Sequence, residues 1–200
     1  MTKSAPTTGK GLLSNFERRI TRLERRTRRA AVEPIPLPNR NLIINGNFRT
    51  NQRGYVSGAA LASGAYGFDR WKSTAAGTTL TFTSAPQGQQ VQVNADHGIS
   101  QIIERANVPA GTYTLSWEGN NGAARVYNVG STPPAFTHAS DQPVQVVLDG
   151  TADVVVEFGN EFGFAFNVGQ VQLERGEVAT PYEWINVTDE LRHCQRYYYR

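Results

Sequence analysis

Residues 108–117 read VPAGTYTLSW, a tight turn followed by a strictly alternating run. Tyr113, Leu115 and Trp117 occupy every second position, so in an extended chain their side chains point to one face. The threonine and serine residues between them point to the other face, which is typical of a strand with one buried side. Because Pro109-Ala110-Gly111 supplies turn residues directly before the run, the stretch predicts a strand that starts at a turn and places Trp117 in a core.

The same alternation recurs along most of the chain after residue 40. It is clear in TLTFTS (79–84), QVQVN (90–94) and VGQVQLE (168–174), and clusters of Gly, Pro, Asn and Asp separate the runs. Short strands at regular spacing, with no helical pattern between them, favour a mainly β fold, an antiparallel two-sheet jelly-roll sandwich over residues 41–200. The expected strands are Asn41–Phe48, Phe68–Ser73, Thr78–Thr83, Gln89–Asn94, Ile99–Arg105, Gly111–Glu118, Ala123–Asn128, Val144–Leu148, Asp153–Phe158 and Phe164–Leu173.

The end of the chain is expected to add a short helical turn and a last strand. Thr188 is in position to cap a turn through Asp189 and Glu190. Residues 195–200, QRYYYR, read as a strand whose consecutive tyrosines alternate between both faces. At least one of these faces must then be exposed to solvent or packed against a neighbouring chain.

A helical pattern precedes the strands, in residues 12–31. Apolar and small residues recur there at alternating steps of three and four, the a/d spacing of a coiled coil. An isolated helix of this length, with so narrow an apolar face, is only marginally stable in water. The pattern therefore predicts association of identical chains. Arg19 and Glu24 fall at g and e positions, where they pair between neighbouring chains, and the seam leaves dimer and trimer open. The expected seam residues are Leu13, Phe16, Ile20, Leu23 and Thr27.

Two further segments flank this helix. Residues 1–11 are rich in Thr, Ser, Gly and Lys and are expected to form an extended tail that orders against a partner. Residues 32–40, VEPIPLPNR, contain three prolines that stop a helix and predict a semi-rigid linker. The expected domain plan is therefore tail, coiled-coil helix, linker and sandwich.

The net charge of +3 is divided unevenly between this arm and the body. Residues 1–40 hold ten Lys or Arg against three Glu, which gives +7, and residues 41–200 hold ten basic against fourteen acidic residues, which gives −4. A mildly acidic body disfavours nucleic acid as a partner. The arginines of the helix are compatible with nucleic-acid contact, but the seam and the interleaved glutamates favour a bundle that docks on an acidic particle surface.

Composition also bears on location and on several kinds of site. No window approaches the ~20 apolar residues of a membrane span, and residues 1–10 lack the apolar core of a secretory signal, so we expect no membrane insertion and synthesis in a cytosol. One cysteine and three separated histidines predict neither a disulfide nor a zinc site. His193 and Cys194 are adjacent on a segment expected to be extended, where they point to opposite faces, so a packed cysteine is expected rather than a catalytic dyad.

Paired carboxylates are the main argument for an enzyme. Asp149 and Asp153 flank one turn, Glu157 and Glu161 flank another segment, and Glu174, Glu177 and Glu183 cluster near the end. Glycoside hydrolysis needs two carboxyl groups that face one cleft roughly 5–10 Å apart. Asp149 before Gly150 instead fits a hairpin turn, and no catalytic residue is expected.

Aromatic residues next to loops are the candidates for ligand contact. Sugars stack their CH faces on aromatic rings, and binding residues concentrate on the loops of rigid sandwiches. Tyr55 and Tyr66 bound one Gly/Ala/Ser-rich stretch, and Tyr127 and Phe136 bound the stretch NVGSTPPAF. The alternative is that these four residues only pin their loops to the sandwich.

Six phrases in order carry a resemblance that covers residues 41–200. Together they resemble a widespread module of tail-fibre and other particle-surface proteins of tailed phages and prophages, which is similar to carbohydrate-binding jelly rolls. The resemblance implies no catalytic residue and suggests that Trp71 is structural. The phrases are NLIINGNF (41–48), QRG (52–54), YGFDRW (66–71), VPAGTYTLSW (108–117), VQLERGEVATPYEW (171–184) and ELRHCQRYYYR (190–200).

The resemblance and the arm together predict a virion fibre or spike, assembled in the host cytoplasm. Fibres of this family are commonly trimeric, so a homotrimer is expected, with other head, portal or tail proteins and a host surface polysaccharide as partners. Three weak sites would gain avidity on a repetitive glycan. The alternatives are a decoration protein without glycan binding, a polysaccharide-degrading enzyme and an assembly factor. No cofactor is expected; related jelly rolls often carry structural calcium, but no loop here has an acidic string with ligand spacing.

Overall fold

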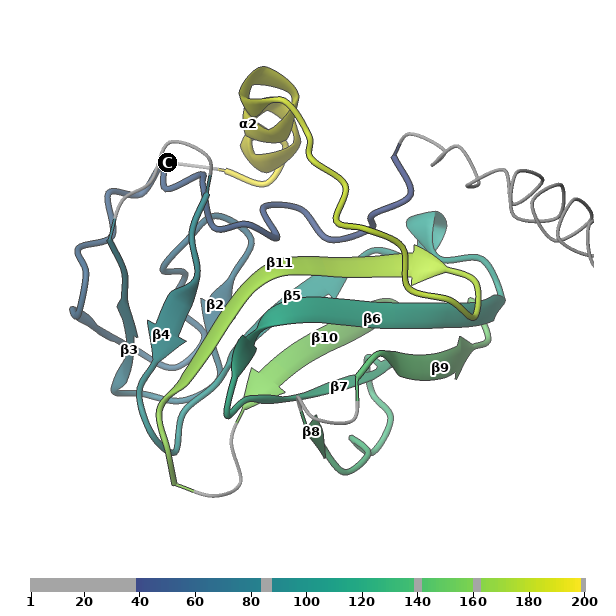
Figure 1. Cartoon of the computed structure of the whole chain (residues 1–200), viewed down its shortest axis with the longest axis horizontal. Coiled ribbons are helices and arrows are strands. Elements are labelled where there is room, and N and C mark those ends of the chain that lie inside the picture. The colour runs from purple at the N-terminus through teal and green to yellow at the C-terminus, as the bar shows by residue number, and fades with distance from the viewer. Residues whose placement is uncertain (1–38, 84–87, 139–141, 160–162, 199–200) are drawn as a thin grey trace, which may run out of the picture. The chain divides into compact units, whose positions relative to one another are not determined.

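We describe the chain from a computed structural model, which covers residues 39–83, 88–138, 142–159 and 163–198. The predicted tail, the coiled-coil helix and most of the linker, residues 1–38, lie outside these ranges. Over the described residues the fold is mainly β, as predicted, with two antiparallel sheets (Figure 1). Their strand orders are β1-β3-β4-β11-β6-β9 and β2-β5-β10-β7-β8.

The elements are labelled as in Figure 1. The six-stranded sheet contains β1 (Ala60–Leu61), β3 (Thr78–Thr81), β4 (Val91–Val93), β11 (Phe166–Arg175), β6 (Gly111–Asn120) and β9 (Val144–Leu148). The five-stranded sheet contains β2 (Lys72–Ser73), β5 (Ile99–Ile103), β10 (Val154–Gly159), β7 (Ala123–Asn128) and β8 (Thr137–His138). A 3-10 turn, η1 (Arg105–Asn107), follows β5, and an α-helix, α2 (Val187–Gln195), follows β11.

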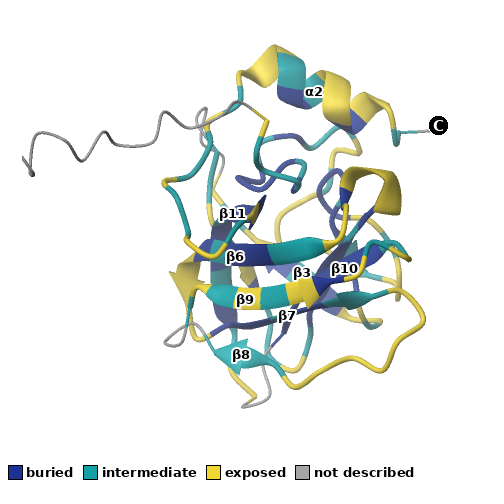
Figure 2. Ribbon diagram, turned by 90° about the vertical axis from the view of Figure 1, so that its right-hand side faces the viewer, coloured by how far each residue is buried: buried dark blue, intermediate teal, exposed yellow. Residues whose placement is uncertain are grey.

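The core contains alternate side chains from both sheets. Tyr113, Leu115 and Trp117 of β6 are 1%, 0% and 5% exposed, which confirms the burial predicted from their spacing. Trp71 is fully buried, stacks on Phe48 and donates a 2.9 Å hydrogen bond from Nε1 to the Asn45 carbonyl. Figure 2 shows the buried residues concentrated in the strands, with exposed residues on the loops and on much of α2.

Most of the predicted strands are present. β7 and β9 have the predicted bounds, β6 is longer than predicted, and six others are shifted or shortened by a few residues. Phe68–Ser73 yields only β2, because Phe68 to Trp71 closes a turn in which Arg70 has a φ of 72°. The short edge strands β1 and β8 were not predicted, because two-residue strands carry no alternation.

The predicted strand Asn41–Phe48 is wrong. The segment is irregular, although most of it is buried. Asn45 and Phe48 take left-handed backbone conformations that a strand excludes, with φ of 60° and 53°. Side chains supply hydrogen bonds here in place of a regular ladder. Gln101 Oε1 accepts from the Ile44 N–H and its Nε2 donates to the Ile44 carbonyl, both at 2.9 Å. The Asn45 side chain pairs with the backbone of Thr50 and Asp69.

The predicted last strand, Gln195–Arg200, is also wrong over its described residues. The expected single turn extends into the nine-residue helix α2, which is followed by a turn rather than a strand. Its N-cap is Asn186 rather than Thr188, since Asn186 Oδ1 accepts from the N–H groups of Thr188 and Asp189 at 2.8 and 3.1 Å. The helix buries Glu190 and Cys194, one turn apart.

The buried face of α2 explains the state of both residues. Burial raises the pKa of Glu190 to about 7, although Arg49 and hydrogen bonds from Asn47 and the Asn45 backbone act in the opposite direction. Burial likewise raises the pKa of the Cys194 thiol to about 12. The expectation of a packed cysteine is therefore confirmed, although Cys194 lies on a helix and not on an extended segment. None of the helices in the described part of the chain is long and apolar enough to cross a membrane.

Candidate functional site

A row of polar side chains crosses the outer face of the five-stranded sheet. The register places Lys72 opposite Ser100, Ser100 opposite Glu157, and Glu157 opposite Arg125, so β2, β5, β10 and β7 contribute one residue each. Side chains alternate along β10, and its Val154, Val156 and Phe158 enter the core. Glu157 and its cross-strand neighbours therefore lie on the opposite, outer face.

Glu157 organises one end of this row. Its carboxylate accepts from Arg125 Nη2 and Nε at 2.9 and 3.0 Å, which is a bidentate pair, and from the Tyr127 hydroxyl at 2.8 Å. The side chains of Glu157 and Arg125 are only 11% and 22% exposed. The guanidinium also lies 4.2 Å from the ring centroid of Phe136, which covers it from the β8 side.

The same network determines the ionisation of Tyr127. Burial, the hydrogen bond to Glu157 and the negative charge of that carboxylate raise the pKa of Tyr127 to about 12, while Arg125 acts in the opposite direction. At neutral pH the phenol is therefore protonated and donates to Glu157. The ring is thereby held in a fixed orientation on the outer face.

A hollow of about 400 Å³ lies over this row. Ser100 is a short side chain between the longer Lys72 and Glu157, so it leaves space above the middle of the sheet. The hollow is lined by Ser63, Gly64, Lys72, Ser73, Thr74, Ser100, Arg125, Tyr127, Val155 and Glu157. Hydroxyl, ammonium, guanidinium and carboxylate groups thus converge on one concave surface that also includes a tyrosine.

The four predicted ligand-contact residues fall into different surroundings. Tyr127 lines the hollow. Phe136 packs against Arg125 and against Gly159, where a Cβ would lie 2.8 Å from its ring, so it supports the network. Tyr66 is 42% exposed and forms a β-bridge with Lys72, so it is next to the hollow in the backbone, and Arg53 lies over its ring.

Tyr55 occupies a position that fits the alternative of loop pinning. Its ring packs against Phe68 and Phe82 at the edge of the core. Its hydroxyl accepts from the Leu80 N–H at 2.9 Å and donates to the Ala59 carbonyl at 2.5 Å. The bond from Leu80 fastens the stretch from residue 54 to 66 to β3, and the bond to Ala59 closes that stretch on itself.

Sequence reasoning missed Lys72, Ser100 and Arg125 and considered Glu157 only as a member of a carboxylate pair. Two signals were available. Glu157 interrupts an apolar strand, and Lys72 is the only lysine after Lys10. Neither signal shows that the four side chains are adjacent in the sheet. The residues lie up to 85 positions apart in the sequence, and only the register of the strands brings them together.

No protein-family model and no curated protein matches this sequence significantly. The chain is similar to several solved structures. The C-terminal family 22 carbohydrate-binding module of Clostridium thermocellum Xyn10B is 14% identical over 72% of this chain and 100% of that chain, with a TM-score of 0.43. TmCBM61, solved with beta-1,4-galactotriose, is 13% identical over 69% of this chain and 100% of that chain, with a TM-score of 0.40.

A third structure is the enzymatically active domain of Bacteriophage CBA120 tailspike protein 4. It is 10% identical over 70% of this chain with a TM-score of 0.42, and the match spans 22% of that domain's own length. The structural neighbours are thus carbohydrate-binding modules and a tailspike domain. Their likeness to this chain concerns the arrangement of strands alone.

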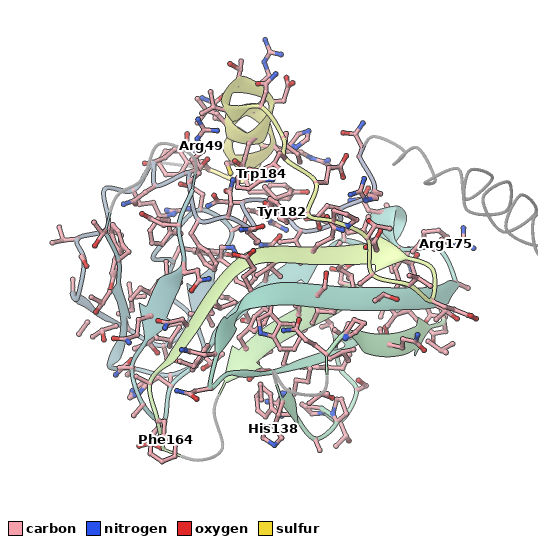
Figure 3. All side chains as sticks on the ribbon, viewed as in Figure 1. Arg49, His138, Phe164, Arg175, Tyr182 and Trp184 are labelled. Carbon is pink, nitrogen blue, oxygen red and sulfur yellow. The ribbon has the colours of Figure 1, made fainter. Side chains whose placement is uncertain are left out.

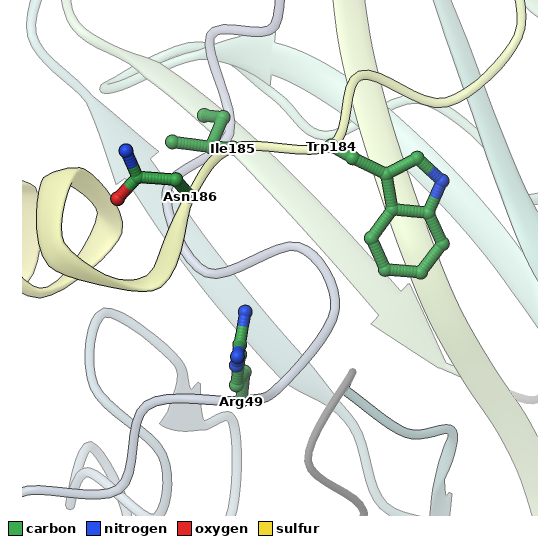
Figure 4. Close-up of a pocket in the computed structure, with 4 residues that line it drawn as sticks. All are labelled: Arg49, Trp184, Ile185 and Asn186. Atoms are coloured by element: carbon green, nitrogen blue, oxygen red, sulfur yellow. The ribbon is translucent and has the colours of Figure 1, made fainter.

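A second, smaller hollow of about 300 Å³ lies beside the segment before α2 (Figure 4). It is lined by Arg49, Trp184, Ile185 and Asn186. Figure 3 shows Arg49, Tyr182 and Trp184 gathered below α2, and the rings of Tyr182 and Trp184 meet edge to face at 5.1 Å. Trp184 is 58% exposed, but this hollow has few polar groups to orient a ligand.

Most of the described carboxylates named in the enzyme argument have structural partners. Asp149 binds the N–H and hydroxyl of Thr151 and the Asn128 amide, and these hydrogen bonds hold its pKa below the usual value. Asp153 accepts from the Arg105 N–H, and Glu174 accepts from Thr180 and Gln172. Among the described residues that line the larger hollow, Glu157 is the only carboxylate.

The described ranges contain no cluster of metal-ligating side chains. No group of three or more His, Cys, Asp or Glu residues there is arranged to hold a metal ion. The polar groups of the hollow are suited to hydrogen bonding with a ligand. Its single carboxylate, Glu157, already accepts three hydrogen bonds and so has little capacity left to bind a metal ion.

Proposed function

We propose that this chain is a carbohydrate-binding protein that holds a saccharide in the outer-face hollow of the five-stranded sheet. The observation that carries the proposal is the row Lys72–Ser100–Glu157–Arg125 under a concavity of about 400 Å³. The volume lies in the range of ordinary small-ligand sites. The resemblance of residues 41–200 to particle-surface modules points in the same direction.

The chemistry of the hollow suits a sugar better than an apolar ligand. A saccharide presents many hydroxyl groups, each a donor and an acceptor, and the hollow offers the hydroxyls of Ser63, Thr74 and Ser100 next to charged side chains. Tyr127 offers a ring that a sugar CH face can cover. Because Glu157 fixes both Arg125 and Tyr127, the site needs little reordering when a ligand binds.

Filling the hollow should abolish saccharide binding. The change Ser100→Phe places a ring over the middle of the row, and we expect at least a tenfold loss of affinity for the glycan that the wild type binds on a glycan array. Val147→Phe is the matched control, because Val147 is 80% exposed on β9 of the other sheet. A folded Ser100→Phe protein that binds with wild-type affinity would contradict the proposed site.

The finer part of the proposal concerns the arm. We propose that residues 12–31 trimerise the chain, that residues 1–11 attach it to a phage-type particle, and that residues 32–40 space the sandwich from that anchor. The heptad pattern and the proline-rich stretch support this arrangement. Three copies of one weak site would then act together on a repetitive host polysaccharide.

A charge in the seam should dissociate the trimer. We expect light scattering of the full chain to give about three times the 22.0 kDa mass of one chain. Ile20→Glu should reduce the measured mass to that of a single chain, because the seam cannot bury a carboxylate. Thr21→Glu carries the same charge one position outside the seam and should remain trimeric. A wild-type protein that is monomeric at micromolar concentration would exclude this arrangement.

A further inference from the structure

Lys72 brings an unbalanced charge to the hollow. It is the only lysine after Lys10, and it lies on β2 at the end of the row. Across the described ranges, its ammonium has no hydrogen-bond or ion-pair partner. An ammonium group in a concave polar surface is therefore available to a ligand.

The other two charges of the hollow neutralise each other. Arg125 gives Nε and Nη2 to Glu157, and its Nη1 lies 3.5 Å from the Pro134 carbonyl. Glu157 in turn accepts three hydrogen bonds from Arg125 and Tyr127. The hollow therefore carries a net charge of +1, in a body whose residues 41–200 sum to −4.

The position of Ser100 separates the free charge from the paired ones. Lys72 and Glu157 lie two strands apart, which is about 10 Å between their Cα atoms at ordinary strand spacing. An anionic group above Ser100 would thus contact the ammonium, while the rest of the ligand extends over Tyr127. Its repulsion from Glu157 would be offset by Arg125.

From this arrangement we propose that the hollow selects an acidic saccharide, whose carboxylate is bound by the Lys72 ammonium. The inference rests on the proposed function, because it names the class of sugar that the same hollow takes. A neutral sugar would leave the ammonium with water alone, whereas a carboxylate gains a charge-assisted hydrogen bond in a partly enclosed site.

The test uses the full chain and short acidic oligosaccharides, namely tetrasaccharides from polygalacturonate, alginate and hyaluronan, each beside its carboxyl-reduced neutral form. Calorimetry at about 0.15 M salt should show at least one acidic form bound about tenfold more tightly than its neutral partner. Lys72→Gln should remove that difference, and Lys72→Arg should retain it. Because the basic arm also attracts anions, Arg192→Gln, which removes one exposed charge from α2, is the control and should behave as wild type.

A second readout locates the anion. Reductive methylation with carbon-13 formaldehyde labels the three lysines and the terminal amine, and the Lys72 signal is assigned by its absence in Lys72→Arg. The acidic tetrasaccharide that binds should shift the Lys72 signal in particular.

Equal binding of acidic and neutral forms, with loss of both in Ser100→Phe, would overturn the acidic preference and leave the proposed function intact. Acidic binding that Lys72→Gln does not weaken would overturn the role of Lys72. Failure of a folded protein to bind either form of any pair, or any glycan on the array, would overturn both proposals.

Discussion

Replacing Trp71 with alanine should lower the free energy of unfolding by about 3–5 kcal/mol. The side chain is fully buried, stacks on Phe48 at 5.1 Å and lies 6.0 Å from the ring of Phe158. The truncation removes these contacts, leaves a large cavity and deprives the Asn45 carbonyl of its indole donor. Denaturant unfolding followed by circular dichroism measures the loss.

Trp184→Ala is the matched control for this experiment. Trp184 is 58% exposed and has an edge contact with Tyr182, so its removal should cost less than about 1 kcal/mol. If Trp71→Ala does not fold, Trp71→Phe keeps most of the ring and loses mainly the hydrogen bond to Asn45. Equal losses in the Trp71 and Trp184 variants would show that Trp71 is not part of the core.

Glu157→Gln should destabilise the protein by about 2–4 kcal/mol, because it leaves a partly buried guanidinium without its carboxylate. The bidentate pair with Arg125 and the hydrogen bond from Tyr127 are all made to this one side chain. The glutamine retains the shape, so the effect measures charge and hydrogen bonding. Chemical unfolding of Glu157→Gln, Arg125→Gln and the double variant gives the coupling between the two residues.

The double variant should lose less stability than the sum of the two single variants. Strictly additive losses would show that the pair contributes nothing beyond its separate parts. In Glu157→Gln the pKa of Tyr127 should also fall from about 12 toward 10, because the carboxylate supplies two of the effects that raise it. Carbon-13 NMR of labelled tyrosine, titrated upward from pH 9, follows that residue individually.

Alternation in the sequence predicted the sheets because burial on one face enforces it. The run around Leu115 has a strict period of two, and the structure places β6 there. In the segment 41–48, Ile43 and Phe48 are buried as well, but the Gln101 side chain, rather than a neighbouring strand, pairs with the Ile44 backbone. Nothing in a residue pattern distinguishes these two ways of satisfying buried backbone.

The C-terminal helix was underestimated for a related reason. Its buried face holds Glu190 and Cys194, and a glutamate is not normally counted toward an apolar stripe. The candidate site lay beyond sequence reasoning, since Lys72, Ser100 and Glu157 come from three strands whose register cannot be read from composition. Tyr127, which lines the hollow, was named from the sequence because it is an aromatic residue beside a loop.

Because the chain's single cysteine is buried, disulfide-linked dimers would report detachment of the C-terminal helix. A thiol beneath α2 that is 1% exposed, with a pKa of about 12, reacts very slowly with oxidants or alkylating reagents while the helix remains in place. A disulfide-linked pair in a stored preparation would therefore come from molecules whose helix had detached. The rate of thiol labelling would report how often the C-terminal segment leaves the body, without any engineered probe.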